Sequence, residues 1–402
     1  MAPMAAAVAV APPNRHAARR STGLRVEVVS DYPSFLNLEA VWNTLAGEAQ
    51  LDHPFLEHVW VRTWWECFGE GSRMHILLVK EGGEAVAIAP LLLTTVKMFG
   101  VKLRRLGFFY NPHVPRAGFI TTRRSKEAHA AIWNHLLTDA CWDVLELCQL
   151  AEGSETLDAI AERAAAAGRR VETWMSAECP YVPVRTSAAP IPWDEYFGGL
   201  PTKHRANLRN RMKRLEARGP AEMETIASGN GLAEALEDGL RLEAAAWKGE
   251  AGTAISSEPA LARFYSLIAH RAAERGWLRL NFLKSGQERI AFDYSLCFKN
   301  RTFLLKHGYD PAHSQFSPSN LLLQFALQSA FEQGLDEYEI LGDSSEWKRC
   351  WAKDVKKHYW LYVFSNGLKA RFAHTAKFRL GPFLKQRVRA LPLAARLLGR
   401  GN

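Results

Sequence analysis

The order of strands and helices in the second half of the chain constrains the fold more than any other feature of the sequence. Apolar and polar residues alternate over 278–282 and 290–298, with the turn Ser285-Gly286-Gln287 between the two runs, and this alternation predicts antiparallel strands. Strand and helix periodicity over the rest of the second half predicts the order β-α-α-β-β-β-α-β-α-β. The predicted elements lie at 222–226, 231–247, 259–275, 278–282, 290–298, 301–308, 318–334, 337–341, 345–353 and 358–364.

A similar order fits the first half, so two related units in tandem are predicted. Its expected elements lie at 24–29, 35–48, 57–68, 74–79, 86–95, 102–108, 127–140, 143–147, 155–168 and 170–174. A length of 402 residues also favours two domains over a single core. We predict an α/β (α+β) protein with mixed, largely antiparallel sheets, divided into a disordered tail at 1–23, a first domain at 24–180, a proline-rich linker at 181–201, a second domain at 202–366 and a basic tail at 367–402.

The net charge of +9 is concentrated near the C-terminus. Residues 355–402 contain eleven Lys and Arg and no Asp or Glu, which leaves 40 basic and 42 acidic residues in the rest of the chain. The basic tail also carries Phe372, Phe378 and Phe383, a mixture that suits weak association with an anionic membrane surface. A tail folded back on the protein body is the alternative.

Several protein classes are disfavoured by patterns that the sequence lacks. No run approaches the eighteen apolar residues of a spanning helix, and prolines interrupt the apolar N-terminal stretch, which argues against a secretory signal. The six cysteines form no Cys-x-x-Cys pair and the histidines show no ligand spacing, so no metal site is expected. P-loop, dinucleotide and serine-hydrolase motifs are absent. These observations predict a cytoplasmic protein with reduced thiols.

Five segments of the second half resemble one branch of a known superfamily. They are RLEAAAWKGEAGTAI at 241–255, AFDY at 291–294, KHGYD at 306–310, SPSNLL at 317–322 and GDSSEWK at 342–348. In these segments the chain resembles the GNAT-superfamily acetyltransferase family that includes CelD-like cellulose-biosynthesis proteins, and more distantly the FemAB-type transferases. The resemblance implies two tandem GNAT-like (acyl-CoA N-acyltransferase) domains. It also implies transfer of an acyl group from acyl-CoA, such as acetyl-CoA, to an amine, with the chemistry in the second domain.

The resemblance points to the start of the helix at 318–334 as the binding site for the acyl-CoA co-substrate. Ser317, Ser319, Asn320 and Leu321 lie where free backbone N–H groups and the positive end of the helix dipole can hold phosphates. The alternative is an ordinary helix start with Pro318 in its first turn. The sequence departs from the family pattern in two ways. The phosphate loop Q/R-x-x-G-x-G/A is absent, and Ser319 stands where the family has glycine, which allows the closest backbone approach to a pyrophosphate.

Asp293 and Lys306 are candidates for the catalytic base and an orienting cation. A two-residue turn at Lys299-Asn300 would place Asp293 directly opposite Lys306 on one face of two paired strands. The pair could line a substrate groove among small neighbours. The alternative is a solvated cross-strand ion pair of little energetic value.

Three further charged residues are candidates from their positions in the matched segments. Asp343 follows a predicted strand at its carboxyl end, where α/β sheets commonly place functional groups, or it caps the next helix with Glu346 in the first turn. Glu243 and Lys248 flank Trp247. Glu243 and Trp247 share a helix face, so the carboxylate can point toward the other domain, or the group can be an ordinary polar helix face.

Three functions remain open from the sequence. The first is an acyl-CoA-dependent N-acyltransferase acting on an amine of a small molecule or sugar precursor, with exopolysaccharide or cellulose biosynthesis as one setting. The second is a FemAB-like transferase that uses aminoacyl-tRNA, motivated by the basic helix at 203–218 and the basic tail. The third is a non-catalytic GNAT-fold binding protein, motivated by Ser319 and the missing glycine loop.

Overall fold

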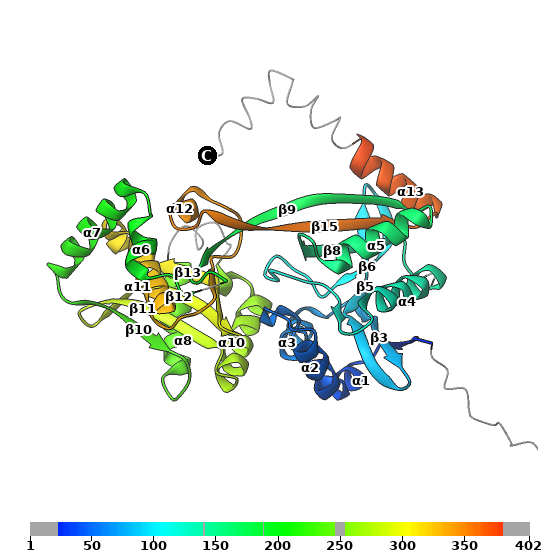
Figure 1. The fold of residues 1–402 in the computed structure, drawn as a ribbon, viewed down its shortest axis with the longest axis horizontal. Helices are drawn as coiled ribbons and strands as arrows, with labels where there is room; N and C mark the ends of the chain where they lie inside the picture. The colour runs from blue at the N-terminus through cyan, green and yellow to red at the C-terminus, as the bar shows by residue number, and fades with distance from the viewer. Residues whose placement is uncertain (1–22, 140, 188, 246–253, 381–402) are drawn as a thin grey trace, which may run out of the picture.

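The computed structural model describes residues 23–139, 141–187, 189–245 and 254–380. Two α/β halves lie side by side along the long axis, and two long strands run across both (Figure 1). Within the described residues, eleven strands form one sheet in the order β10-β11-β12-β13-β14-β9-β15-β8-β6-β5-β2, and four form a second sheet in the order β1-β3-β4-β7.

The first half follows the predicted order of elements, with two strands and one helix divided and a short strand at 120–121 added. The strand expected at 74–79 is interrupted at His75 and its two parts lie in different sheets, and the helix expected at 35–48 is two helices. Pro90 lies inside the single strand expected at 86–95, and the structure has two strands there that belong to different sheets. Proline has no N–H for a ladder hydrogen bond, so the chain changes sheet at that point. The elements are β1 (Arg25–Val29), α1 (Tyr32–Asn37), α2 (Glu39–Glu48), η1 (Pro54–Leu56), α3 (His58–Phe68), β2 (Arg73–Met74), β3 (Ile76–Glu81), β4 (Glu84–Ala89), β5 (Leu91–Met98), β6 (Val101–Phe108), β7 (Ile120–Thr121), α4 (Ser125–Thr138), β8 (Val144–Ala151), α5 (Glu155–Ala166) and β9 (Arg170–Pro183).

The second half confirms the predicted order β-α-α-β-β-β-α-β-α-β. Its meander is antiparallel, and Phe298 pairs with Arg301 across the two-residue turn, as expected. The elements are α6 (Trp193–Gly198), α7 (Thr202–Glu216), β10 (Ala221–Ile226), α8 (Leu232–Ala244), η2 (Ile255–Ser257), α10 (Pro259–Glu274), β11 (Leu278–Ser285), β12 (Glu288–Phe298), β13 (Arg301–Tyr309), η3 (Pro311–Phe316), α11 (Pro318–Glu332), β14 (Glu337–Glu339), α12 (Glu346–Arg349), β15 (Asp354–Phe364), α13 (Leu368–His374) and η4 (Thr375–Leu380).

The two halves exchange strands. Strand β15, the last strand of the second half, lies between β8 and β9 of the first half, and the C-terminal end of β9 pairs with β14 of the second half. The shared ladder makes one continuous sheet, so the halves are joined by backbone hydrogen bonds as well as by side chains. The division of the chain into domains at 181–201 stays a prediction, and that segment includes the end of β9 and helix α6.

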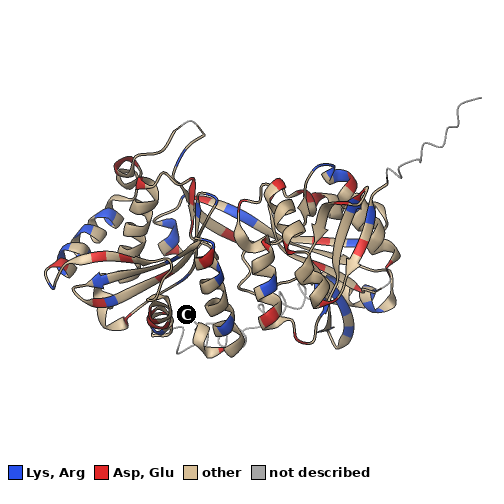
Figure 2. Ribbon diagram, turned by 90° about the horizontal axis from the view of Figure 1, so that it is seen from below, with Lys and Arg blue, Asp and Glu red and all other residues tan. Residues whose placement is uncertain are grey.

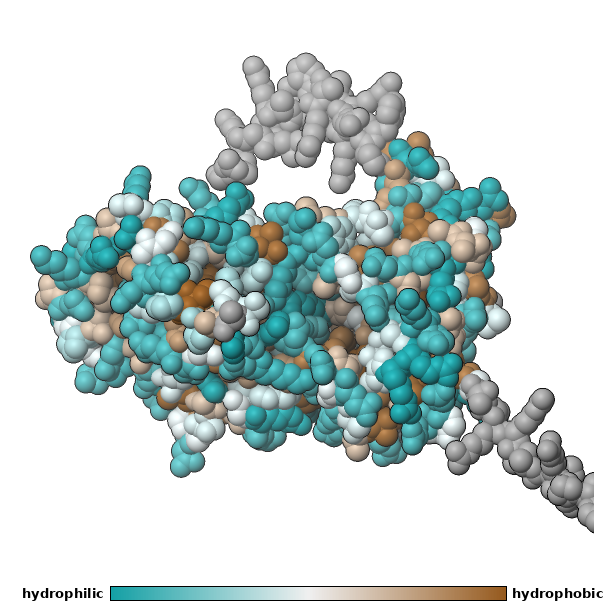
Figure 3. All heavy atoms as spheres, viewed as in Figure 1, coloured by the Kyte–Doolittle hydropathy of each residue, from teal (hydrophilic) through white to brown (hydrophobic). Residues whose placement is uncertain are grey.

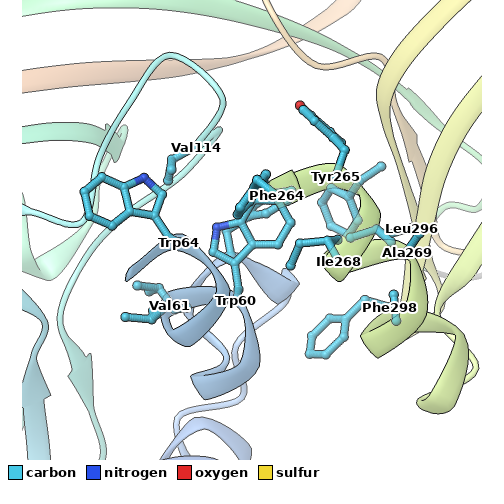
Figure 4. Close-up of a cluster of buried hydrophobic side chains, with 14 of the residues drawn as sticks. Trp60, Val61, Trp64, Val114, Phe264, Tyr265, Ile268, Ala269, Leu296 and Phe298 are labelled. Carbon is cyan, nitrogen blue, oxygen red and sulfur yellow. The ribbon is translucent and has the colours of Figure 1, made fainter. Parts of the chain in front are cut away.

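A hydrophobic cluster joins the halves below the shared sheet. Trp60 of α3 points toward Phe264 of α10, with ring centroids 5.2 Å apart, and the same cluster includes Trp64 and Tyr265 (Figure 4). At the edge of this contact the guanidinium of Arg271 donates to Glu66, at 2.7 Å. Aromatic side chains bury large areas in specific orientations, so this cluster holds α3 and α10 in a defined arrangement.

The described part of the basic tail folds back on the first half. Ala370 and Ala373 of α13 are buried against Tyr362 and Phe364 of β15. The face of α13 turned to solvent carries Phe372, whose side chain is 52% exposed. The outer surface in the view of Figure 3 is predominantly hydrophilic. No helix within the described residues has the length and apolar character needed to cross a membrane.

Candidate functional site

Two neighbouring strands of the second half separate and leave an opening between them. Strands β13 and β14 are parallel and pair over only three residues, from Arg301 opposite Glu337 to Phe303 opposite Glu339. Beyond this point β13 continues to Tyr309, whereas β14 ends. The backbone groups past Phe303 therefore have no partner on β14, and the space between the diverging chains is available to other groups.

A cavity of about 460 Å³ lies at this divergence and is lined by both halves. Its volume falls within the range of small-molecule sites. The second half contributes Tyr265, Leu305, Lys306, Leu341, Gly342, Asp343 and, from the exchanged strand β15, Trp360. The first half contributes Tyr110, Pro112, His113, Val114, Pro115, Gln149, Trp174, Ser176, Ala177 and Cys179. We call it the interdomain cavity. It brings together Lys306 and Asp343, two of the residues predicted from the sequence.

A β-bulge directs Lys306 into the interdomain cavity. The pairing between β12 and β13 shifts between Tyr294 and Ser295, so that Leu305 is an extra residue and Lys306 pairs with Tyr294. The predicted pairing of Asp293 with Lys306 is therefore wrong by one residue, because the bulge reverses the faces of the residues beyond it. The Lys306 ammonium instead lies 5.4 Å from the centre of the Tyr265 ring.

Asp293 faces the opposite side of the sheet. It pairs with His307 on β13 and with Asn281 on β11, and it is 1% exposed, which also excludes a solvated ion pair. Burial raises the pKa of Tyr338 well above its usual value, and the nearby charge of Asp293 raises it further. Asp293 therefore belongs to the buried polar layer between the sheet and α11 and does not line the interdomain cavity.

The electrostatics of the interdomain cavity centre on Lys306 and a histidine that the sequence analysis missed. Burial, followed by the charge of Lys306, lowers the pKa of His113 to about 4, so its imidazole is neutral near pH 7. The Tyr265 hydroxyl lies 3.4 Å from Nδ1 of His113. Burial raises the pKa of Tyr265, so this hydroxyl keeps its proton and can donate. No periodicity or motif marks the loop at 110–115, and only its position in the fold brings His113 to the site.

Asp343 reaches the cavity on a turn that needs glycine. Gly342 has φ of +76°, a left-handed conformation that glycine adopts without strain, and the Lys348 ammonium donates to the carbonyl of Leu341 in the same turn. The alternative role for Asp343 as a helix cap is wrong, because Ser345 occupies the N-cap position of α12. The Asp343 side chain is therefore available to the cavity that it lines.

Glu243 supports the site from behind. Its carboxylate is 1% exposed and accepts the backbone N–H of Ile255 at 2.9 Å, which contradicts the alternative of a polar, solvated helix face. Its charge raises the pKa of Tyr265, after the larger effect of burial. Glu243 is therefore placed to position η2 and α10 rather than to contact a ligand. Lys248 and Trp247, the other residues of this predicted group, lie outside the described residues.

The predicted co-substrate residues lie at the start of α11, away from the interdomain cavity. Ser317 has φ of +49° and its side chain caps nothing, whereas the amide oxygen of Asn320 accepts the indole N–H of Trp351 at 3.0 Å. The side chain of Leu321 is buried in the core, so this residue could contact a ligand only through its backbone. The Ser319 hydroxyl is buried without a hydrogen-bond partner among the described residues. Their role in binding acyl-CoA stays a prediction.

The basic helix α7 packs beside the start of α11. Arg214 and Arg218 lie over the ring of Phe316, the last residue of η3, at 5.6 and 5.2 Å. Lys and Arg positions, blue in Figure 2, recur along the ribbon of α7. In the part of the chain that the structure describes, the Lys and Arg residues of α7 and Arg218 form no ion pair with a carboxylate. This arrangement leaves positive charge beside the helix start.

Comparisons with known proteins agree with this arrangement. Residues 202–349 match the model of the family described as "Acetyltransferase (GNAT) domain". No curated protein sequence matches the chain. Among solved structures, FemX is similar at 12% identity over 84% of this chain and 98% of that chain, with a TM-score of 0.54. A conserved protein of unknown function from Bacteroides thetaiotaomicron VPI-5482 is similar at 10% identity over 85% and 100% of the two chains, with a TM-score of 0.51.

A tandem GNAT protein from the clavulanic acid biosynthesis pathway also matches, at 11% identity over 85% of this chain and 100% of that chain, with a TM-score of 0.47. At these identities structural similarity shows the fold alone. The match at 202–349 covers Lys306, Asp343 and the start of α11. Residues 202–349 therefore match a GNAT acetyltransferase domain, and the chain shares its overall fold with FemX.

Proposed function

We propose that the protein is an N-acyltransferase that transfers an acyl group from acyl-CoA to an amine bound in the interdomain cavity. The observation that carries the proposal is that the domain matching the GNAT family contributes both Lys306 and Asp343 to one cavity, where β13 and β14 separate. The first half closes the other side of this cavity with aromatic side chains. A site between two halves can enclose a small amine and exclude water from it.

In this proposal Asp343 binds the acceptor amine and takes its proton as the new bond forms. A carboxylate attracts an ammonium group and, within hydrogen-bond reach, can act as the base. Lys306 supplies a fixed positive charge where the carbonyl oxygen of the acyl group becomes negative. Tyr265 keeps its proton and orients His113, and the neutral imidazole adds a polar contact without a second positive charge. The thioester supplies the acyl group and an easily displaced thiol.

The start of α11 fits the phosphates of acyl-CoA in two respects. The buried Ser319 hydroxyl has no hydrogen-bond partner among the described residues, and α7 places unneutralised arginines beside the helix start. Helix N-termini bind phosphate through backbone N–H groups and the helix dipole. Ser317, Ser319, Asn320 and Leu321 would hold the phosphates there. A backbone contact at Ser319 must accommodate a side chain where the resembling family has glycine.

Enzyme assays of two charge-removing variants test this assignment. Release of free thiol from acetyl-CoA would be measured with a panel of amines that includes glucosamine. We expect Asp343→Asn to lower kcat/KM by on the order of 10² to 10⁴, and Lys306→Met to lower kcat by on the order of 10² to 10³. Asp293→Asn is the matched control, because this carboxylate faces α11. The kcat/KM of this variant should stay within a few-fold of the parent value. Loss of activity in the control with retention in Asp343→Asn would reverse the assignment.

Binding of the co-substrate is tested separately by thermal unfolding. A ligand at 100 times its Kd stabilises the folded state by about 2.7 kcal/mol, so saturating acetyl-CoA should raise the Tm. Arg214→Ala and Arg218→Ala should reduce this rise. If neither acetyl-CoA nor longer acyl thioesters change the Tm, the proposed co-substrate is wrong.

The positive surface of α7 also favours a second candidate, a transferase that uses aminoacyl-tRNA. A helix whose Lys and Arg have no carboxylate partners among the described residues suits a polyanion. Such binding would be tight at low salt and would weaken steeply as salt rises. Absence of tRNA binding at low salt would eliminate this candidate and leave acyl-CoA.

We further propose a cytoplasmic setting, where acyl thioesters are formed and the six free cysteines stay reduced. The resemblance to CelD-like proteins motivates a sugar precursor as the acceptor, in exopolysaccharide or cellulose biosynthesis. Activity with glucosamine but not with amino acids would support that narrower assignment.

A further inference from the structure

A second group of chemically reactive side chains lies in the first half, separate from the interdomain cavity. It consists of His75 between β2 and β3, His135 in the last turn of α4, and Asp139 and Cys141 just after α4. We call it the His75 cluster. The cluster therefore joins the connection between β2 and β3 to the C-terminal end of α4 and the turn that follows it. None of its members lines the interdomain cavity.

The ligand atoms of the His75 cluster converge. One nitrogen of His75, a carboxylate oxygen of Asp139 and the sulfur of Cys141 all lie within 4.8 Å of one another. Nε2 of His75 lies 3.2 Å from Oδ2 of Asp139, yet this contact lacks the geometry of a hydrogen bond. Two ligands on a tetrahedral zinc, with bonds of about 2.0–2.1 Å, are roughly 3.3 Å apart and direct their lone pairs at the metal.

The histidines of the cluster have unused nitrogen atoms. Nε2 of His75 and Nε2 of His135 are both buried without a hydrogen-bond partner in the described chain, and the two rings lie 6.2 Å apart between centroids. A buried polar atom with no partner costs about 1–3 kcal/mol.

We propose that His75, Asp139 and Cys141 bind one Zn²⁺, and that His135, which lies outside the group of ligand atoms within 4.8 Å of one another, supplies the fourth bond after its side chain rotates toward the ion. The metal would tie the edge strand β2 and the start of β3 to the end of α4. Binding displaces the proton of the Cys141 thiol to solvent, and the thiolate and the Asp139 carboxylate together neutralise the two charges of the ion. Because four protein ligands close the coordination shell, the site is structural.

The ligand chemistry favours zinc over other common ions. A set with two nitrogens, one sulfur and one oxygen is typical of Zn²⁺, whereas Mg²⁺ and Ca²⁺ take oxygen ligands alone. The Asp139 side chain is 26% exposed, so the ion has a path from solvent. Linear spacing gives no signal for this site, because His75 lies 60 positions before His135; for that reason no metal is expected from the sequence.

Metal titration of the full chain tests the proposal. The protein would be stripped with a chelator and titrated with Co²⁺ and then Zn²⁺. We expect one equivalent of Co²⁺ to give a thiolate-to-cobalt charge-transfer absorption that Zn²⁺ abolishes. Cys141→Ser should lose this absorption while still folding by circular dichroism. His75→Ala should weaken Zn²⁺ binding by at least on the order of tenfold.

The chain offers a matched control in a second group of acidic and histidine side chains. Glu288, Asp310 and His313 also bring three ligand atoms within 4.8 Å, but at a more exposed place and without a thiol. His313→Ala should leave both the cobalt absorption and the Zn²⁺ affinity unchanged. Absence of the absorption, or Zn²⁺ binding that His75→Ala and Cys141→Ser leave unchanged, would overturn the proposal. Since none of these changes touches Lys306 or Asp343, acyl transfer tests a separate question.

Discussion

Gly308 of β13 lies at the closest approach between this strand and helix α8. A Cβ atom at this position would lie 2.4 Å from the Cα of Glu243, 2.6 Å from the carbonyl oxygen of Leu242 and 2.7 Å from the backbone N of Glu243. All three atoms belong to backbone, so no side-chain rotation relieves the contact. We therefore expect Gly308→Ala to push α8 away from β13 by on the order of 1 Å, because carbon atoms pack at about 3.5–4.0 Å.

The structure sets the size of the effect. Overpacking a well-packed core costs about 1–3 kcal/mol, and a contact with backbone belongs at the upper end of this range. Displacement of α8 also strains the hydrogen bond from Ile255 N–H to the Glu243 carboxylate, and hydrogen bonds to charged groups contribute about 1.5–3 kcal/mol. The free energy of unfolding should therefore fall by about 3 kcal/mol or more.

Urea unfolding followed by tryptophan fluorescence measures this change. The control is Gly47→Ala in α2, where a Cβ meets no atom within 4 Å. Replacing a helical glycine by alanine should stabilise the protein by roughly 0.5–1 kcal/mol. The free energy of unfolding of Gly308→Ala could instead lie within about 0.5 kcal/mol of the parent value, with the slope m unchanged. In that case α8 does not pack on β13 as described. Lys306 is two residues away, so the variant should also lose activity.

Three further outcomes are expected. Burial, followed by the charge of Arg116, lowers the pKa of both His53 and His358 to about 3. The unfolded chain then gains protons below pH 6.5 while the folded protein does not, so the free energy of unfolding falls as pH falls from about 6.5 toward 3, by at most about 2 kcal/mol for each histidine at pH 5. Urea titrations at pH 7.5 and pH 5 measure this, and equal stability at both would contradict it. Lys306→Met should raise the pKa of the imidazole of His113, measured by NMR titration, because it removes a nearby positive charge; an unchanged pKa would mean that Lys306 points elsewhere. The parent chain should sediment with vesicles that contain phosphatidylglycerol but not with pure phosphatidylcholine vesicles, and Phe372→Glu should reduce that binding; equal sedimentation with both lipids would exclude the membrane partner.

Much of the fold could be predicted because strand and helix periodicity is local. Alternation over 290–298 and the turn at Lys299-Asn300 led to the correct meander and to the pairing of Phe298 with Arg301. Pro90 was a visible signal that the expected strand at 86–95 would divide, since proline interrupts a ladder. The exchange of β9 and β15 between the halves could not be predicted, because strand order in a sheet depends on contacts far apart in the chain.

By itself the sequence determined which elements form, that they repeat, and that the second half resembles a GNAT domain. Only the tertiary structure decided which candidates share a site. A single extra residue, Leu305, turned Lys306 toward Tyr265 and away from Asp293, and this bulge leaves no pattern in the residues themselves. His113 joined the site through a loop of the other half. The physical reason is that periodicity records which face of an element is buried, whereas a site depends on the register and packing between elements.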